Sequence, residues 1–182
     1  MRLFTGLDLP EGVSGKLKLV IDRLRPAASI HWTPLENLHI TTKFIGEWQG
    51  ERLDELRSAL AAMAPRPPIR VHVRRVGFFP NPHAPHMFWC GIEAPGLAEL
   101  AADTDRATAS LGIASETRAY SPHLTLARIK RRTNLQPLRE AIAALDSLDF
   151  GSFEANGLFL YQSTPGSNSS VYTKLAEFLF TK

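Results

Sequence analysis

Two short stretches, "HITTKFIG" at residues 39–46 and "SPHLTLARIK" at residues 121–130, share one local pattern. In each stretch a threonine follows a histidine by two residues, within a run of apolar residues that predicts a β-strand. A single His-x-Thr triplet arises easily by chance. Two triplets at equivalent places of a repeated pattern do not, and the two histidines, His39 and His123, lie 84 residues apart.

The segments that flank the two motifs follow the same order. Each motif strand is preceded by a strand and a helix and is followed by a helix and a strand, so the series occurs twice with an offset of about 84 residues. Apolar residues three and four apart predict the helices, and apolar runs between turn residues predict the strands. The predicted helices span 11–25, 53–63, 96–111 and 138–148, and the predicted strands span 2–9, 38–45, 69–78, 87–93, 122–129, 153–161 and 171–180.

This organisation predicts a single domain over residues 1–182, formed by internal duplication. Helices and strands alternate in hairpin-like units without a nucleotide-binding glycine loop, which favours the α+β class with antiparallel sheets. We expect two pseudo-symmetric lobes, each with a sheet and helices, and a central cleft with one His-x-Thr motif from each lobe. Phe4 and Phe88, each 35 residues before a motif histidine, are aligned as equivalent positions.

Composition limits the class of protein without deciding its function. Hydrophobic residues make up 44% and charged residues 21%, values typical of a globular chain with a sizeable core. The lone Cys90 excludes an internal disulfide framework and fits a reducing, cytoplasmic setting. No apolar run is long enough for a membrane span, and the N-terminus does not resemble a secretory signal.

The charge balance is compatible with a polyanionic partner such as RNA. The net charge is +3 and the pI is about 9.2, which is a mild excess. The densest basic patch is "RIKRR", at residues 128–132. Two interpretations of this patch stay open, a solvated loop after a strand and an electrostatic attraction for nucleic acid.

Strand periodicity predicts which side chains of the first motif share a face. Alternate residues point to opposite sides, so His39, Thr41 and Lys43 are expected on one face of the strand 38–45. Ile40, Thr42 and Phe44 are expected on the opposite face. The motif therefore presents an imidazole and a hydroxyl side by side from a rigid strand.

The second motif presents His123 and Thr125 in the same way. An imidazole titrates near neutral pH, so one histidine can remove a proton while the other delivers one. The threonine hydroxyls can donate hydrogen bonds to oxygens that gain negative charge in a transition state. A phosphodiester fits this arrangement, because its in-line displacement puts the entering and leaving oxygens on opposite sides.

On these motifs the sequence resembles the 2H phosphoesterases, and within them the bacterial and archaeal RNA 2′,3′-cyclic phosphodiesterases, historically called 2′-5′ RNA ligases. The resemblance covers nearly the whole chain. It rests on ordered segments that include "RLFTGLDLP", "HWTPLENLHITTKFIGE", "VGFFPNPHAPHMFWCGIE", "YSPHLTLAR" and "LFLYQS". It implies a bilobal fold that works without a metal or another cofactor and hydrolyses a terminal 2′,3′-cyclic phosphate to a 2′-phosphomonoester.

The resemblance also implies roles for the motif residues. His39 would be the proton donor to the departing 3′ oxygen, and His123 the proton acceptor that activates water, while Thr41 and Thr125 hold the phosphate. Thr42 departs from the family, which usually has an apolar residue there. Because Thr42 is expected on the core-facing side, this departure concerns local packing more than the chemistry.

Two basic residues are further candidates for substrate binding. Arg128 matches an arginine common in the family, but a regular strand would point it away from His123, so a bulge or twist is required. Lys43 lies on the expected face of its strand but in no specific motif, and the alternative is a solvated lysine at a sheet edge.

Other features favour structural interpretations. The spacing of His83 and His86 resembles part of a zinc site, but no second ligand pair accompanies it, which favours a surface loop. The aromatic residues Trp32, Phe44, Phe79 and Trp89 are expected in the core, with the alternative that one or two stack on a terminal base.

The sequence thus predicts a monomeric RNA-end phosphoesterase, with tRNA fragments among its possible substrates. Two alternatives stay open. A ligase acting on 2′–5′ linkages would use the same histidines in the reverse direction. A noncatalytic RNA-binding module would keep the fold, although binding alone needs no matched acid and base.

Overall fold

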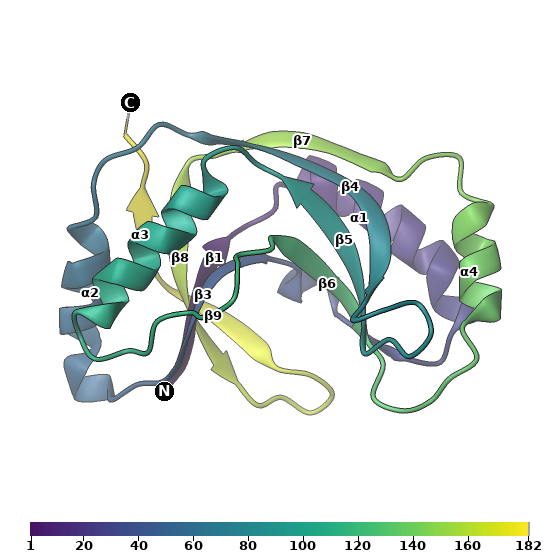
Figure 1. Cartoon of the computed structure of the whole chain (residues 1–182), viewed down its shortest axis with the longest axis horizontal. Helices are drawn as coiled ribbons and strands as arrows, with labels where there is room; N and C mark the ends of the chain where they lie inside the picture. The colour runs from purple at the N-terminus through teal and green to yellow at the C-terminus, as the bar shows by residue number, and fades with distance from the viewer. Residues whose placement is uncertain (182) are drawn as a thin grey trace.

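The computed structural model describes residues 1–181 and confirms the predicted α+β class (Figure 1). The helices are α1 (Glu11–Leu24), α2 (Leu53–Ala61), α3 (Leu97–Ala109) and α4 (Gln136–Ala143). The strands are β1 (Arg2–Leu7), β2 (His31–Trp32), β3 (Ile40–Glu47), β4 (Ile69–Phe79), β5 (Met87–Glu93), β6 (His123–Arg128), β7 (Asp149–Ala155), β8 (Gly157–Thr164) and β9 (Val171–Leu179). Within this described part of the chain, no helix is long and apolar enough to cross a membrane.

The strands form two antiparallel sheets, one in each lobe. The sheet of lobe 1 has the strand order β3-β1-β8-β9, and the sheet of lobe 2 has the order β2-β6-β5-β4-β7. Helices α2 and α3 pack together against lobe 1, on β9 and β3, while α1 and α4 pack on lobe 2. Figure 1 shows the two helix pairs at opposite ends of the molecule, with the strands between them. The predicted bilobal arrangement is therefore confirmed.

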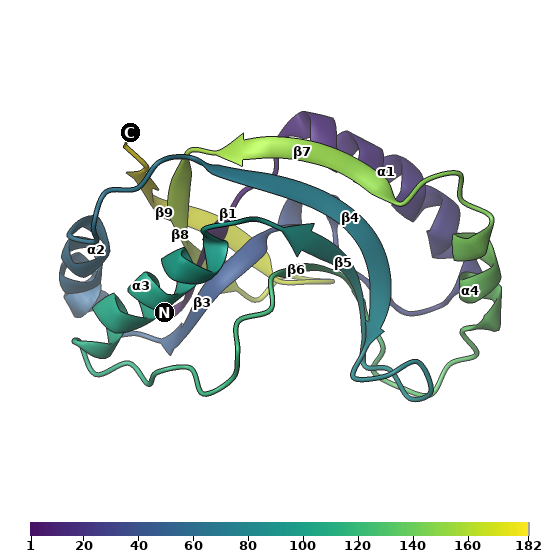
Figure 2. The same cartoon turned by 45° about the horizontal axis from the view of Figure 1, so that its top comes forward.

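The two halves of the sequence do not each form one lobe. The first half contributes α1 and β4 to lobe 2, and the second half contributes α3 and β8 to lobe 1. The prediction of one strand over residues 153–161 is wrong. At Asn156 the chain passes from β7 in the sheet of lobe 2 to β8 in the sheet of lobe 1. Figure 2 shows β7 arching over the molecule into β8. Each half of the sequence therefore contributes strands and helices to both lobes, and the chain crosses between the lobes several times.

The amphipathic stripes predicted from the sequence are buried in two cores. The apolar side of α1 packs beneath the sheet of lobe 2, and the smaller core of lobe 1 lies between its sheet and α2. The buried stripe residues are Val13, Leu17, Ile21 and Leu24 of α1 and Leu56 and Leu60 of α2. Burying a side chain of this size stabilises a fold by about 1.5–3 kcal/mol, so each helix is fixed to its lobe mainly by this stripe.

A β-bulge interrupts the strand of the first motif. On β3, Thr41 pairs with Gly6 and Lys43 pairs with Thr5, so Thr42 is an extra residue. A bulge bends the strand and reverses the alternation of side chains beyond it. Lys43 and Phe44 therefore point to the sides opposite to those that a regular strand predicts, before a second register shift at Ile45.

The second motif strand has a bulge at the matching place. On β6, Thr125 pairs with Trp89 and Ala127 pairs with Phe88, which leaves Leu126 as the extra residue. Thr42 and Leu126 are 84 residues apart, the same spacing as the motif histidines. The similarity of the two motif strands thus extends to their irregularity.

The bulges also correct the alignment of the repeats. Phe44 and Arg128 hold equivalent places after the two bulges, and their cross-strand partners are Phe4 and Met87. The prediction that Phe4 is equivalent to Phe88 is therefore off by one residue. Phe88 is a fully buried core residue, whereas Phe4 and Met87 face the region between the lobes.

Candidate active site

Both motifs open onto one cavity between the lobes, with a volume of about 720 Å³. His39 and Thr41 line it from lobe 1, and His123 and Thr125 line it from lobe 2. The structure therefore brings together the four motif side chains that the sequence selects. Arg128 lines the same cavity, because the bulge at Leu126 supplies the change of direction that a regular strand lacks.

The two histidines are held in the same tautomer by their own backbone. The Nδ1–H group of His39 donates to the carbonyl oxygen of Asn37 at 2.7 Å, and that of His123 donates to the carbonyl oxygen of Ser121 at 2.8 Å. A carbonyl oxygen can only accept a hydrogen bond, so Nδ1 carries the proton in both rings. Nε2 is thus the nitrogen of each ring that can take up or release a proton.

Aromatic side chains surround His39. Its ring lies 4.7 Å from the ring of Phe4 and 5.2 Å from that of Tyr172, which meets it edge-on. Its Nε2 lies 2.8 Å from the hydroxyl oxygen of Thr41. This packing fixes the orientation of the ring.

Burial lowers the pKa of His39, since desolvation disfavours the imidazolium. The hydrogen bond to Asn37 and the charge of Asp8 raise the pKa, and the charge of His123 lowers it further. The surroundings of His39 therefore favour its neutral form. The repulsion between His39 and His123 also favours one charged and one neutral ring over two charged rings.

The second motif is less enclosed. His123 is partly exposed, and the hydroxyl of Thr125 donates only to the sulfur of Met87, at 3.6 Å. Sulfur is a weak acceptor, so an anionic oxygen in the cavity would compete for this hydroxyl. Lobe 2 thus presents an accessible imidazole and an available donor.

Two side chains without a recognisable motif brace the site. The hydroxyl of Tyr120 donates to the carbonyl oxygen of Thr41 at 2.8 Å, and so joins the segment before β6 to β3. The amide of Asn37 donates to the carbonyl oxygen of Ser170 at 2.7 Å. Burial raises the pKa of Tyr120, so its hydroxyl remains a donor. The sequence offered no signal for either residue, because their partners are backbone atoms distant in the chain.

The prediction that Lys43 faces the cleft is wrong. Its ammonium contacts Asp105 Oδ1 at 2.6 Å, the carbonyl oxygen of Ala114 at 2.7 Å and Glu116 Oε1 at 3.7 Å. The side chain is 1% exposed and points toward α3, because the bulge at Thr42 reverses its direction. The hydrogen bond from Lys43 lowers the pKa of Asp105. Lys43 is thus a buried structural cation.

The same bulge explains two neighbours of Lys43. Thr42 is buried on the core-facing side, where its hydroxyl lies 2.6 Å from that of Thr5, so both hydroxyls are satisfied. Phe44, predicted in the core, is instead 63% exposed and lines the cavity.

The remaining aromatic predictions divide. Phe79 at the end of β4 is 51% exposed, so its predicted core position is wrong. Trp32 is partly buried and meets the core residue Phe88 edge-on at 6.0 Å. Trp89 is partly buried and packs over Gly77, where no side chain would fit beneath its ring.

The charges around the cavity favour an anion. Arg128 and Arg2, which the sequence did not single out, both line it, and no aspartate or glutamate does. Neither arginine has an ion-pair partner within 4.0 Å among residues 1–181. Unneutralised guanidinium groups in a cavity without carboxylates attract phosphate groups.

His83 and His86 lie elsewhere. They line a separate hollow with the loop 129–133, outside the cavity of the two motifs. Among residues 1–181, no cluster of three or more histidine, cysteine or acidic side chains is placed to hold a metal ion. Cys90, in β5, is fully buried.

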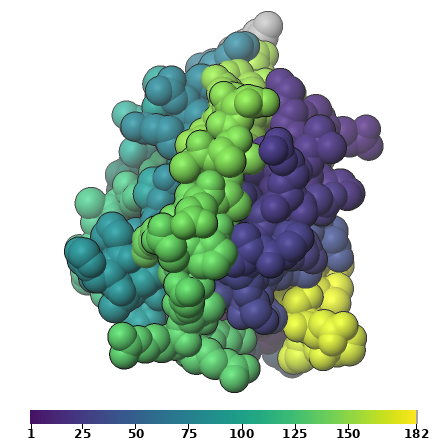
Figure 3. Space-filling model, turned by 90° about the vertical axis from the view of Figure 1, so that its right-hand side faces the viewer, coloured from purple at the N-terminus to yellow at the C-terminus, as the bar shows by residue number. Residues whose placement is uncertain are grey.

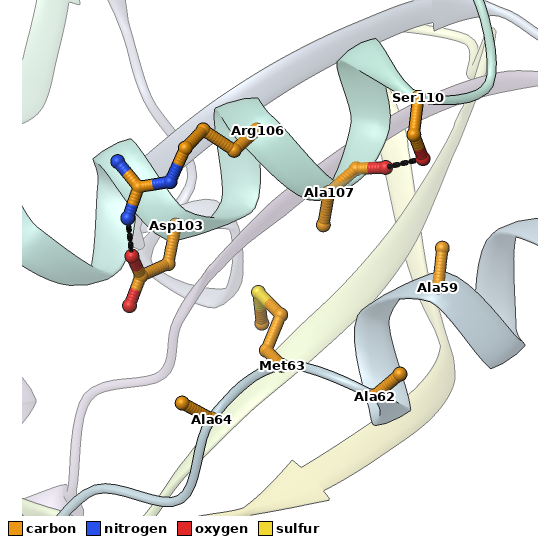
Figure 4. Close-up of a pocket in the computed structure, with 8 residues that line it drawn as sticks. All are labelled: Ala59, Ala62, Met63, Ala64, Asp103, Arg106, Ala107 and Ser110. Carbon is orange, nitrogen blue, oxygen red and sulfur yellow. Dashed lines mark hydrogen bonds and ion pairs between the residues drawn. The ribbon is translucent and has the colours of Figure 1, made fainter.

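A further hollow lies between α2 and α3 on lobe 1 (Figure 4). Half of its lining residues are alanines, and Met63 lies between the helices. Its charged residues Asp103 and Arg106 are paired with each other, and the hydroxyl of Ser110 is bonded to the carbonyl oxygen of Ala107. These groups are already satisfied, so the hollow offers no chemistry comparable to that of the cavity between the motifs.

The fold and the pair of histidines define a class of phosphoesterase, and comparison with known proteins agrees. The family described as LigT like Phosphoesterase matches residues 7–89 and 92–172, and each of these segments contains one His-x-Thr motif. The chain belongs to this family.

Known proteins resemble the chain over nearly its full length. An RNA 2′,3′-cyclic phosphodiesterase of Methanocaldococcus jannaschii is 33% identical over 177 residues, which cover 97% of this chain and 99% of the relative. The crystal structure of TT0787 of Thermus thermophilus superposes with a TM-score of 0.82 at 28% identity, over 99% and 98% of the two chains. That of E. coli LigT complexed with 3′-AMP superposes with a TM-score of 0.79 at 25% identity, over 100% and 98%.

Proposed function

We propose that this protein hydrolyses the 2′,3′-cyclic phosphate at the end of an RNA to a 2′-phosphomonoester. The observation that carries the proposal is the pair of imidazoles, His39 and His123, held in one tautomer on opposite lobes of one cavity. Two arginines that form no ion pair within residues 1–181 line the same cavity. The names of the relatives, RNA 2′,3′-cyclic phosphodiesterases, support the same substrate class.

The two histidines would divide the proton transfers between them. Nε2 of neutral His123 takes a proton from water as the water oxygen bonds to phosphorus. The bond from phosphorus to the 3′ oxygen breaks, and the Nε2–H group of charged His39 protonates that oxygen. The hydroxyls of Thr41 and Thr125 donate to the non-bridging oxygens, and Arg128 offsets their growing charge. Exchange of protons with solvent then restores both rings.

The two lobes present different side chains to the cavity, and this asymmetry supports the assignment of the two histidines. Phe44 and Arg128 occupy equivalent places after the two bulges, so lobe 1 offers an exposed ring where lobe 2 offers a cation. A base stacks well on an exposed aromatic ring, whereas a guanidinium binds phosphate oxygens. The terminal nucleoside would then lie on lobe 1, beside His39, and the attacking water on the side of His123.

The low pKa of free His39 fits a proton donor that is charged by its substrate. The anionic phosphate favours the imidazolium, so binding would raise the pKa that burial and His123 lower. Once protonated, a histidine of low intrinsic pKa releases its proton readily to the alkoxide.

The pH dependence of kcat/KM is expected to be bell-shaped between about pH 5 and about pH 9. Activity requires one neutral ring as the base and one charged ring as the acid, so it falls at low pH, where no base is free, and at high pH, where no acid remains. In His39→Ala the residual activity is expected to rise with pH to a plateau, because only the base remains. Initial rates across the pH range would check both curves. A high-pH fall that persists in His39→Ala would contradict the assignment of His39.

Gly6→Ala is expected to reduce kcat/KM roughly 10- to 100-fold, because a Cβ at Gly6 would lie 2.7 Å from the carbonyl oxygen of Ile40 and 3.6 Å from His39. The clash would displace the backbone that carries the histidine. Gly15→Ala in α1 is the matched control, since a Cβ there meets nothing within 4 Å. Steady-state kinetics of both variants check the prediction. Equal, near-normal activities would show that β1 does not position His39.

The proposal is tested with a short RNA that ends in a 2′,3′-cyclic phosphate. Chromatography should show conversion of the cyclic end to a phosphomonoester, equally with and without EDTA, while the same RNA with a linear phosphate is unchanged. Loss of activity in EDTA would contradict metal-free catalysis by the histidines. RNA binding without hydrolysis would favour the noncatalytic module, and joining of RNA ends without hydrolysis would favour the ligase.

The proposal includes a monomeric enzyme of duplicated origin. Both motifs belong to one chain and complete the cavity without a second copy, and their strands share the bulge and an offset of 84 residues. We also place the enzyme in the cytoplasm, a reducing setting that the lone Cys90 fits, with the ends of tRNA fragments among its substrates.

A further inference from the structure

The cavity has more positive charge than one cyclic phosphate requires. A 2′,3′-cyclic phosphate carries a single negative charge, and Arg128 lies beside Thr125 to meet it. Arg2 lines the cavity from the other lobe, on β1, with an exposed side chain. A second guanidinium in the same cavity, with no ion-pair partner in the described part of the chain, indicates a second anionic group on the ligand.

Arg2 stands among hydroxyl groups. It pairs in register with Ser163 on β8, and Ser163 and Ser170 also line the cavity. These serines flank the turn of the β8–β9 hairpin, whose yellow end lies at the lower right of Figure 3. An arginine and two hydroxyls form a donor set suited to a phosphodiester, which accepts hydrogen bonds and donates none.

The nearest carboxylate in register does not neutralise Arg2. Glu47 is the cross-strand neighbour of Arg2 on β3, and its carboxylate lies 3.6 Å from the N-terminal ammonium of Met1. Within residues 1–181, Glu47 forms no ion pair with Arg2. Arg2 therefore remains available to a ligand.

The asymmetry between the two lobes places the rest of the RNA near Arg2. In the proposed reaction the 3′ oxygen departs toward His39, so the terminal nucleoside and its 5′ oxygen lie on lobe 1. Phe4, two residues after Arg2 on β1, contacts the ring of His39. The strand that carries Arg2 thus runs directly past the expected position of this nucleoside.

We propose that Arg2, with the hydroxyls of Ser163 and Ser170, binds the phosphodiester on the 5′ side of the terminal nucleotide. The protein then prefers the cyclic ends of RNA chains to cyclic mononucleotides. This inference rests on the proposed function. The basic loop 130–132 lies on lobe 2 outside the cavity, so we expect it to have no part in this preference.

The experiment compares three substrates by kcat/KM. They are adenosine 2′,3′-cyclic phosphate, the dinucleotide ApA with a 2′,3′-cyclic phosphate, and the same dinucleotide with a neutral methylphosphonate linkage between the nucleosides. We expect the wild-type protein to prefer the charged dinucleotide to the mononucleotide by about tenfold, because a charged hydrogen bond is gained. The neutral linkage should remove this preference.

Arg2→Gln is expected to lower kcat/KM for the charged dinucleotide about tenfold more than it lowers kcat/KM for the mononucleotide. The variant should also make the charged and neutral linkages equivalent, a result that a general structural defect would not produce. Arg131→Gln is the matched control, because it removes one cation from the loop of lobe 2 and should preserve the preference.

The outcomes separate this inference from the proposed function. If Arg2→Gln hydrolyses the mononucleotide and the dinucleotide with the charged linkage and keeps the wild-type preference for that dinucleotide, the inference is overturned. The proposed function would still stand. A preference abolished by Arg131→Gln instead would move the upstream phosphate to lobe 2. If the wild-type protein hydrolyses none of the three substrates, the proposed function fails as well.

Discussion

Replacement of His39 or His123 by alanine is expected to lower kcat/KM for a cyclic-phosphate RNA end by roughly 10² to 10⁴-fold each. Each variant removes one of the two proton transfers. The rings are hydrogen-bonded only to backbone carbonyls and Thr41, so their loss should leave the fold intact. Single-turnover kinetics would measure the loss in the chemical step.

The double variant, with both His39 and His123 replaced by alanine, tests whether the two histidines act together. The two histidines act in one transition state, so removing both should cost much less than the product of the single effects. His83→Ala, in the outer loop, serves as the control and should keep normal kinetics. Near-normal activity in either single cavity variant, with an unchanged circular dichroism spectrum, would rule out the two-histidine mechanism.

Lys43→Met is expected to destabilise the fold by about 3 kcal/mol while the folded protein keeps its kcat. The ammonium of Lys43 is almost fully buried between β3 and α3, and its loss leaves Asp105 and the carbonyl oxygen of Ala114 without their donor. Removing one partner of a buried ion pair costs about 3–5 kcal/mol. We expect the lower end because Asp105 is 21% exposed and also accepts from the backbone N–H of Glu116.

Denaturant unfolding measures this loss, and Lys18→Met gives its control. Lys18 pairs with Asp22 on the surface of α1, with both side chains more than half exposed, so its loss should change stability by less than about 0.5 kcal/mol. A Lys43→Met protein of normal stability that has lost substrate affinity would restore the substrate-binding role predicted from the sequence.

The sequence was sufficient to predict the four helices, most of the strands and the motif side chains, because these depend on short-range patterns. The apolar spacing of α1 follows from the helical period, and His39 and Thr41 share a face since two residues separate them. The cavity that joins them to His123 and Thr125 follows from the repeat. These features need no knowledge of which strands pair.

Features that depend on strand pairing were beyond the sequence. Whether Lys43 or Phe44 faces the cleft depends on the bulge at Thr42, which arises from pairing with Thr5 and Gly6 about 36 residues away. The exchange of β4 and β8 between the lobes is equally invisible, because periodicity identifies a strand but not its neighbour.

Arg2 escaped notice for a related reason. It belongs to no motif, and an arginine near a chain terminus is ordinarily a solvated surface residue. Only the packing of β1 between β3 and β8 brings it to the cavity.

The identity of the phosphomonoester formed in ¹⁸O-labelled water tests the central claim most directly. An RNA ending in a 2′,3′-cyclic phosphate would be hydrolysed by the wild-type protein and its product assigned by ³¹P NMR. If His39 protonates the 3′ oxygen while His123 activates water, the product is a 2′-phosphate alone, with one ¹⁸O on phosphorus and none on the ribose. A 3′-phosphate, or a mixture of the two isomers, would contradict this placement of the nucleoside between the two histidines.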